Sequence, residues 1–255
     1  MEFVIVNYSP RVYPHRWPDQ VAKRLFDVIL CILALPFLIP ILIVCAIAIR
    51  LDSPGPAFFI QERVGKDGQI FRMFKFRTMK HNLDDSFHRA FMKAFVKGQI
   101  GERYNGTGKN GKQSDPPSAF RRAFIESEAE EKKNGAQKTY KPFQDSQVTW
   151  VGRILRKTSL DELPQVWNVL RGEMSLVGPR PNVPWEVEAY EPWHCERLEV
   201  LPGITGLAQV KGRSSISFDA ITEYDIEYIM QQSVAMDLKI LWWTFSAVFS
   251  GAGAE

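Results

Sequence analysis

The sequence is poor in the residue types that build metal centres and disulfide frameworks. It contains 3 cysteines and 4 histidines among 255 residues. Three cysteines are too few for a disulfide framework, and Cys31 and Cys45 lie inside an apolar run. The histidines show no spacing typical of metal ligands. These absences exclude a disulfide-stapled secreted domain and favour a reducing, intracellular setting.

Further absences narrow the function. The net charge of +3 is too small to indicate a nucleic-acid partner, although it is compatible with binding to anionic lipid or phosphate. No glycine cluster is followed by Gly-Lys-Ser/Thr, which excludes a phosphate-binding P-loop. Residues 1–20 contain prolines and charges instead of an apolar core, so we expect no cleavable signal peptide.

The first informative feature that is present is an apolar run at residues 28–49, VILCILALPFLIPILIVCAIAI, which carries no charge. Its length, roughly 22 residues, is what a helix needs to cross a bilayer. Pro36 and Pro40 lie inside it, and basic residues flank both ends, so the positive-inside rule gives no direction. We therefore expect a re-entrant membrane helix over residues 23–51, broken at these prolines, that enters and leaves by the same face. A straight span kinked at Pro40 and a buried core helix are the alternatives.

Residues 57–63 and 70–76 are predicted to form a β-hairpin. Both segments are β-prone, and the connecting GKDG contains the Asp-Gly pair typical of hairpin turns. The second segment runs into FKFRTM, where apolar and cationic residues alternate, and this alternation places Lys75 and Arg77 on one face. The two cations form either a solvated strand face or a phosphate-facing pair, and the strand pattern alone favours the solvated face.

The chain changes character at residues 81–147, which are polar and rich in Lys, Glu, Gly and Asn. We interpret this stretch as an insertion in the folded domain, with amphipathic helices at 87–96 and 119–132 and a flexible loop between them. Ordered patterns return after the insertion. They predict a short strand at 207–210 and helices at 186–198, 218–231 and 236–249. The last helix carries aromatic residues on several faces, as expected of a helix at a membrane interface.

The candidate catalytic residues are Asp161 and Glu162, in the segment RKTSLDELPQ. If a helix starts at Ser159, then Ser159-x-x-Glu162 is a capping box and the carboxylates only stabilise the helix start. If Pro164 takes its preferred first helical position, the carboxylates project from the preceding turn. Either way the pair lies at a helix start with Arg156 upstream, an arrangement suited to binding phosphate. From the residues alone, simple capping and a functional pair are both open.

Six stretches of the sequence stand out as motifs: KRLFD (residues 23–27), QERVG (61–65), FKFRTM (74–79), RKTSLDELPQVWNVLRGEMSLVGPRP (156–181), LPGITGLAQVKGR (201–213) and DLKILW (237–242). Together they resemble the bacterial sugar transferase family, the monotopic polyprenyl-phosphate phosphoglycosyl transferases. SLDELPQ followed at this distance by GPRP is highly specific. The chain is similar to the minimal form of the family, without the N-terminal transmembrane helices of larger relatives. It has Ile39-Pro40 where the family's helix break often has Ser-Pro.

The resemblance implies a reaction and roles for individual residues. In this family the Asp of the Asp-Glu pair attacks the β-phosphate of a UDP-sugar and releases UMP, and polyprenyl phosphate then accepts the phospho-sugar. Asp161 would be the nucleophile and Glu162 its partner, and both carboxylates would serve as Mg²⁺ ligands. Substrate-binding roles are assigned to Lys75, Arg77, Arg156, Pro179, Arg180 and Arg213. Pro179-Arg180 resembles the family's uridine-binding turn, whose alternative is a structural arginine in a tight loop.

The predicted fold is α/β and mostly helical. An N-terminal segment (1–22) and the re-entrant membrane helix (23–51) precede a catalytic domain (52–250) that carries the small β-hairpin, interfacial helices and the polar insertion. We expect this domain on the cytoplasmic face of the bacterial inner membrane. The expected partners are a UDP-sugar, polyprenyl (undecaprenyl) phosphate and the lipid bilayer, with no nucleic acid; homo-oligomerisation is left open.

Two rival functions come from other classes. One is an inactive membrane-anchored scaffold, which should lack the Asp-Glu pair or the Pro-Arg turn. The other is a metal-dependent phosphatase of lipid diphosphates, which would use carboxylates and cations in a similar way. Release of UMP that requires both a UDP-sugar and polyprenyl phosphate separates the transferase from both rivals. The sequence names neither the sugar nor the glycan pathway.

Overall fold

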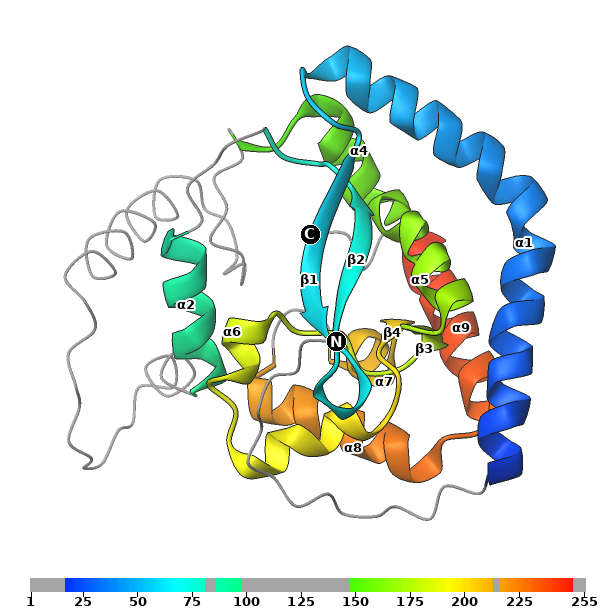
Figure 1. Ribbon diagram of the computed structural model, residues 1–255, viewed down its shortest axis with the longest axis vertical. Coiled ribbons are helices and arrows are strands. Elements are labelled where there is room, and N and C mark those ends of the chain that lie inside the picture. The colour runs from blue at the N-terminus through cyan, green and yellow to red at the C-terminus, as the bar shows by residue number, and fades with distance from the viewer. Residues whose placement is uncertain (1–16, 81–85, 98–146, 213–215, 250–255) are drawn as a thin grey trace.

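The computed structural model describes residues 17–80, 86–97, 147–212 and 216–249. Within these ranges the chain is mostly helical, with two small two-stranded sheets. Figure 1 shows a long helix running along one side of a domain that is built around a central β-hairpin. The elements, in chain order, are α1 (Trp17–Asp52), β1 (Phe58–Val64), η1 (Lys66–Gly68), β2 (Ile70–Phe76), α2 (Ser86–Val96), α4 (Trp150–Lys157), η4 (Leu160–Gln165), α5 (Val166–Arg171), β3 (Ser175–Val177), α6 (Pro184–Val187), η5 (Pro192–Glu199), β4 (Gly203–Thr205), α7 (Leu207–Lys211), α8 (Phe218–Gln231) and α9 (Val234–Phe249).

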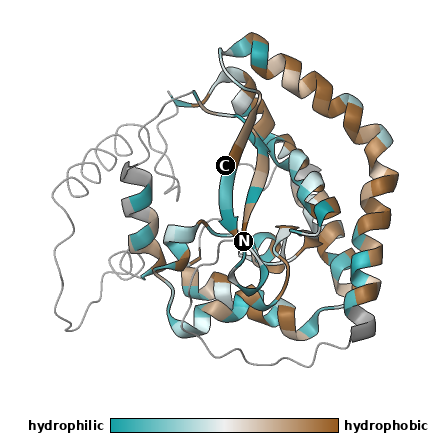
Figure 2. Cartoon of the chain, in the orientation of Figure 1, coloured by the Kyte–Doolittle hydropathy of each residue, from teal (hydrophilic) through white to brown (hydrophobic). Residues whose placement is uncertain are grey.

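Helix α1 contains the whole apolar run and begins before the predicted boundary at residue 23. It is continuous through Pro36 and Pro40, both of which are exposed, so the predicted break of the helix at these prolines is wrong. Figure 1 shows that it curves around the domain, as expected where prolines remove hydrogen bonds on the outer face. Its part Gln20–Asp52 is long and apolar enough to cross a membrane, and an 18-residue window within it has a mean hydropathy of 3.1. Figure 2 shows hydrophobic residues along nearly its full length.

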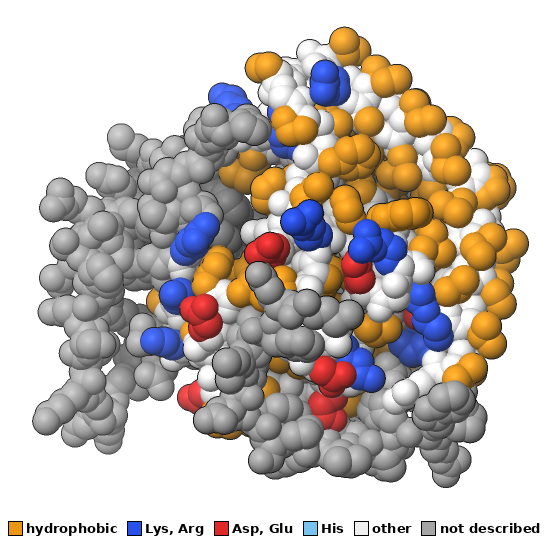
Figure 3. All heavy atoms as spheres, in the orientation of Figure 1, with side chains coloured by type: hydrophobic (Ala, Val, Ile, Leu, Met, Phe, Trp, Pro, Cys, Tyr) orange, Lys and Arg blue, Asp and Glu red, His pale blue; other side chains and the backbone are white. Residues whose placement is uncertain are grey.

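One face of α1 packs against the rest of the protein. The residues on this face recur every three or four positions, the spacing of one side of a helix. They are Cys31, Leu35, Leu38, Leu42, Cys45 and Ile49, which contact the hairpin and the helices α4 and α5. The opposite face is exposed: Phe37 is 75% exposed and Val44 is 66% exposed. Figure 3 shows hydrophobic side chains gathered over this helix.

Charged residues fix the first turns of α1 to the domain. The Lys23 ammonium lies 2.6 Å from Asp237 of α9 and donates to the carbonyl of Val177. Tyr228 of α8 donates to the same carboxylate at 2.7 Å. Arg24 donates to the last carbonyls of α5, a common way to satisfy the free acceptors of a helix end. The motifs KRLFD and DLKILW, far apart in the sequence, therefore form one buried polar contact.

The predicted hairpin is confirmed. β1 pairs antiparallel with β2, and the turn between them has positive φ at Asp67 and Gly68, as the Asp-Gly pair indicates. Arg77, which follows β2, is buried and donates to the carbonyls of Ser53 and Pro54. The guanidinium of Arg77 therefore holds the chain that connects α1 to β1.

The strands β3 and β4 form a second, parallel sheet, and at its end the motif GPRP, which follows β3, is hydrogen-bonded to PGITG, which contains β4. Gly178 and Gly203 let the two backbones approach: a Cβ on Gly178 would lie 2.4 Å from the carbonyl oxygen of Leu201. The short strand predicted at 207–210 is wrong. These residues form helix α7, and the strand is the preceding segment, Gly203–Thr205, because that segment finds a pairing partner in β3.

Part of the predicted insertion belongs to the folded core. Helix α2 coincides closely with the predicted helix at 87–96, and its residues Phe95 and Val96 pack against Phe218 of α8. The second predicted helix, at 119–132, lies outside the described residues.

Candidate functional site

The acid pair lies in a short 3₁₀ helix that follows α4. Ser159 separates the two helices with φ 56°, a left-handed conformation that non-glycine residues rarely adopt. Such strain costs on the order of 1–3 kcal/mol and persists only where the surrounding structure imposes it. The Ser159 side chain makes no capping hydrogen bond, so the capping-box interpretation is wrong. Both carboxylates are thereby free to face other groups.

Glu162 is held by two cations from distant parts of the chain. Lys75 Nζ of β2 lies 2.9 Å from Glu162 Oε1, and Arg180 Nη1, beyond β3, lies 3.2 Å from the same oxygen. Burial alone would raise the pKa of Glu162, but Arg180 and Lys75 outweigh it and lower this pKa to about 2. The carboxylate of Glu162 is therefore ionised at any physiological pH.

Asp161 is in a different environment. Its side chain is half-buried, and within the described part of the chain no hydrogen bond to it is found. Burial and the adjacent Glu162 raise the pKa of Asp161, while Lys75, Arg180 and Arg156 lower it by a smaller amount. A carboxylate that lies close to cations but accepts no hydrogen bond from them keeps its oxygens available for a reacting atom.

Arg156 completes the cationic wall around the pair. It comes from the last turn of α4, and its Nε donates to the Thr78 hydroxyl at 2.9 Å. Burial lowers the pKa of Arg156, and Asp161 raises it, which places the guanidinium within electrostatic reach of that carboxylate. Lys75 and Arg180 carry the remaining positive charge.

Not every predicted substrate residue is in this cluster. Lys75, Arg156 and Arg180 surround the acid pair, and Pro179 precedes Arg180 in the turn after β3. The guanidinium of Arg77 is bonded instead to the turn after α1, although the strand pattern placed it on one face with Lys75. Arg213 lies outside the described residues.

A small cavity opens beside Lys75 and Arg180. Its lining joins the hairpin, the 3₁₀ helix and β4 through Arg63, Met73, Gln165, Pro181, Gly203 and Ile204. Sequence reasoning had not assigned Arg63 or Gln165 to the site. Their only signal was membership of the motifs QERVG and SLDELPQ.

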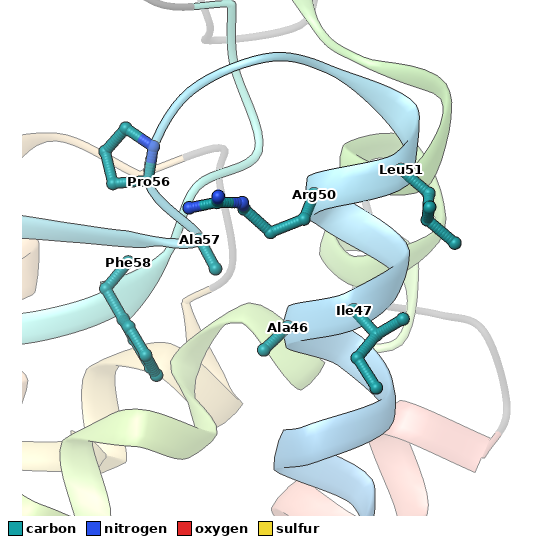
Figure 4. Close-up of a pocket in the computed structure, with 7 residues that line it drawn as sticks. All are labelled: Ala46, Ile47, Arg50, Leu51, Pro56, Ala57 and Phe58. Carbon is teal, nitrogen blue, oxygen red and sulfur yellow. The ribbon is translucent and has the colours of Figure 1, made fainter.

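A second hollow lies on the apolar side of the molecule, between the end of α1 and the start of β1. Figure 4 shows Arg50 reaching from the helix toward Pro56 and Ala57, while Leu51 points away. Phe58 forms the opposite wall. This hollow is lined almost entirely by apolar side chains, and neither Asp161 nor Glu162 is among them.

The acid pair and the three cations around it provide the groups that phosphoryl transfer needs. Cations can neutralise a diphosphate, and an unbonded carboxylate can attack phosphorus. No group of three or more His, Cys, Asp or Glu side chains suited to a metal occurs in the described ranges. Asp161 and Glu162 offer carboxylate oxygens, and Mg²⁺ usually needs one or two carboxylates plus substrate phosphates. The pair therefore fits Mg²⁺ bound together with a diphosphate.

Comparisons with known proteins identify sugar transferases as relatives of this chain. The family described as "Bacterial sugar transferase" matches residues 18–251. "Exopolysaccharide production protein ExoY" of Sinorhizobium fredii is 36% identical over 92% of this chain and 88% of its own length. "Galactosyl transferase CpsE" of Streptococcus agalactiae is 34% identical over 99% of this chain. "UDP-glucose:undecaprenyl-phosphate glucose-1-phosphate transferase" of Escherichia coli is 34% identical over 91% of it. The chain spans 47% and 40% of the lengths of these last two relatives.

Proposed function

We propose, because this chain belongs to the bacterial sugar transferase family, that it moves a sugar-1-phosphate from a UDP-sugar to polyprenyl phosphate and releases UMP. The observation that carries the proposal is the unequal acid pair. Glu162 is bonded to Lys75 and Arg180, whereas Asp161 lies beside the same cations without a bond to them. The name of the E. coli relative supplies the substrate class, a UDP-sugar and undecaprenyl phosphate. Polysaccharide or glycoconjugate assembly would be the pathway.

The reaction proceeds in two displacements. A carboxylate oxygen of Asp161 attacks the β-phosphorus of the UDP-sugar, and the bond from that phosphorus to the bridging oxygen breaks, so UMP leaves. The phospho-sugar is then attached to Asp161 as an acyl phosphate. An oxygen of the lipid phosphate attacks the same phosphorus and frees the Asp161 carboxylate. Splitting the transfer lets one small site use a soluble donor and a membrane-bound acceptor in turn.

The cations of the site bind and orient the donor diphosphate in the first step, and the phospho-sugar and the lipid phosphate in the second. Lys75 and Arg180 face the phosphates while keeping Glu162 ionised, and Arg156 faces Asp161. Asp161 and Glu162 would hold Mg²⁺. When bound, Mg²⁺ neutralises charge on the phosphoryl oxygens and on the departing UMP.

For membrane attachment we propose a re-entrant α1 with the catalytic domain on the cytoplasmic face of the inner membrane. Both ends of the helix touch the same domain: Lys23 contacts Asp237 near the start, and the Asp52 carboxylate accepts from the Val151 backbone at the end. A helix that crossed the bilayer would place its two ends on opposite sides of the membrane, where they could not both contact this domain. UDP-sugars are made in the cytosol, which sets the side.

Neighbouring helices would extend the membrane contact. The exposed apolar residues outside α1 include members of α4, α5 and α9, three helices that contact α1. Aromatic rings at a bilayer surface prefer the headgroup region. The residues concerned are Trp150, Ile154, Trp167, Leu238, Trp242 and Phe245.

The proposed activity is tested by UMP release from the purified protein in detergent or nanodiscs. We expect repeated turnover, with many UMP molecules released per protein, only when a UDP-sugar and polyprenyl phosphate are both present, with phospho-sugar lipid as the second product. With the UDP-sugar alone, release should stop at about one UMP per protein, because Asp161 then carries the phospho-sugar. A screen of UDP-sugars then identifies the donor. Hydrolysis of a polyprenyl diphosphate without UMP release would support the phosphatase instead, and the absence of both reactions would support an inactive scaffold.

A further inference from the structure

The turn that carries Arg180 is held more firmly than a surface turn requires. Prolines on both sides, Pro179 and Pro181, fix their own φ angles. The Arg180 side chain is 49% exposed and reaches Glu162, so its backbone is restrained while its guanidinium stays accessible.

Every backbone carbonyl from residue 179 to residue 182 accepts a hydrogen bond from another element. Gly203 of β4 donates to the Pro179 carbonyl at 2.9 Å, and Val64 of β1 donates to the Asn182 carbonyl at 2.9 Å. The two carbonyls between them are bound by arginine side chains. Two side chains therefore restrain the backbone next to Arg180.

The first guanidinium belongs to Arg197 of η5. Its Nη2 donates to the Arg180 carbonyl at 3.2 Å and lies 2.6 Å from the Asp225 carboxylate, and its Nη1 donates to the Asn182 side chain. Arg197 is 3% exposed, and in this pair its positive charge is balanced by Asp225.

The second guanidinium belongs to Arg63 of β1. Its Nη1 donates to the Pro181 carbonyl at 3.0 Å, and its Nη2 donates to the Gln61 side chain at 2.7 Å. Its Nε is buried without a hydrogen bond, and the residue lines the cavity beside Lys75 and Arg180. Burial lowers the pKa of Arg63 to about 10, the direction expected for a charge removed from water.

We propose that Arg63 and Arg197 are positioning residues for Arg180. They hold the backbone carbonyls of Arg180 and Pro181, and thereby aim the Arg180 guanidinium at the acid pair and at the nucleotide diphosphate. This inference rests on the proposed function, because it takes Arg180 to contact the donor. It predicts that Arg63 affects nucleotide binding only through Arg180.

The test uses Arg63, since removing Arg197 would leave the buried Asp225 charge unpaired and could unfold the protein. Arg63→Met should weaken UMP binding, measured by calorimetry, and raise KM for the UDP-sugar by about tenfold, with a smaller change in kcat. Arg63→Lys keeps a donor for the Pro181 carbonyl and should lie closer to wild type. Arg72→Met, an exposed arginine on the same hairpin, is the matched control and should bind normally.

A double-mutant cycle decides between an indirect and a direct role. In the Arg180→Met background, adding Arg63→Met should produce no further loss of UMP binding, because the group it positions is absent. An additional loss equal to that of the single variant would overturn the inference, as would normal binding by Arg63→Met. Binding of UMP is measured without turnover. A wild-type protein that binds UMP but produces no UMP from UDP-sugars would therefore contradict the proposed function and leave this inference untouched.

Discussion

At the scale of single residues, the adjacent carboxylates Asp161 and Glu162 have opposite electrostatic environments. Lys75 and Arg180 bind Glu162 and lower its pKa to about 2, whereas burial and the charge of Glu162 raise the pKa of Asp161. Pairs of titratable groups whose surroundings push their pKa values apart are typical of active sites. The division supports a fixed charge at Glu162 and a reactive carboxylate at Asp161.

This difference predicts the acid side of the pH profile. Asp161 must be ionised to attack, and its pKa is raised above the ordinary 3.8, so UMP release should fall as the pH decreases through that raised value. The pKa of Glu162 is lowered to about 2, so this carboxylate is ionised over the measured range and should not contribute to the loss. Initial rates measured from pH 4 upward, with thermal midpoints at each pH, provide the test. An acid limb that instead follows unfolding of the protein would contradict the assignment to Asp161.

The sequence predicted that the acid pair, Lys75, Arg156 and Arg180 belong to one site because they lie in recognisable motifs, and the structure brings them together. It could not show which carboxylate the cations would bind. That outcome depends on the left-handed Ser159 and on contacts between residues 87 and 18 positions apart. Arg77 shows the converse case: strand alternation placed it beside Lys75, but the turn after α1 offers its guanidinium two carbonyls.

At the scale of helices and strands, the sequence predicted the elements that are marked by neighbouring residues, such as a turn or a helical periodicity. The hairpin was signalled by its Asp-Gly turn, and α8 was predicted with its observed bounds. The strand at 207–210 was wrong because β4 exists only through its pairing with β3, which a local pattern does not reveal. The pairing of Lys23 with Asp237 was equally invisible, since 214 positions separate the two residues.

The ion pair between Lys23 and Asp237 predicts how the protein responds when the start of α1 is released from α9. Asp237→Asn removes the nearer of the two carboxylates beside the buried Lys23 ammonium and leaves only Asp27, at 3.9 Å. Removing one partner of a buried ion pair costs about 3–5 kcal/mol, and the remaining carboxylate puts this change at the lower end. We expect a clear fall in the thermal midpoint, measured in detergent, and easier proteolysis near the start of α1. Glu223→Gln, an exposed change on α8, should leave the midpoint unchanged and serves as the control. An unchanged Asp237→Asn would mean that α1 is not held by this contact.

The topology of α1 gives a second prediction at this scale. Single cysteines placed near Asp19 and near Ser53, in a background without native cysteines, should have the same accessibility to an impermeant thiol reagent in intact cells. The physical reason is that both ends of α1 contact one domain. Pro40→Ala should shift some molecules toward a straight span by restoring a backbone donor. Opposite accessibility of the two sites would show a membrane-crossing helix.

At the scale of the whole molecule, the protein joins an apolar side to the polar cluster that we propose to be catalytic. Hydrophobic side chains cover the surface over α1 (Figure 3), while Asp161 and Glu162 lie among cations drawn from α4, β2 and the turn after β3. This division suits an enzyme that takes a soluble donor from one side and a lipid acceptor from the other.

The insertion should be partly dispensable for the stability of the whole fold. Helix α2 packs Phe95 and Val96 against α8 and should be retained. Replacing residues 101–117 with a short Gly-Ser linker should leave the thermal midpoint nearly unchanged, because the segment is polar and loop-closure entropy varies slowly with length. A drop of many degrees would show that the segment packs into the core.

The central claim is a covalent phospho-sugar on Asp161, and trapping that intermediate tests it most directly. Wild-type protein would be incubated with a UDP-sugar labelled in its β-phosphate, without lipid acceptor, beside Asp161→Asn, which keeps the shape and removes the nucleophile. We expect label on the wild-type protein, its transfer to polyprenyl phosphate when the lipid is added, and no label on Asp161→Asn. Labelling of Asp161→Asn, or near-normal UMP release by it, would contradict the account.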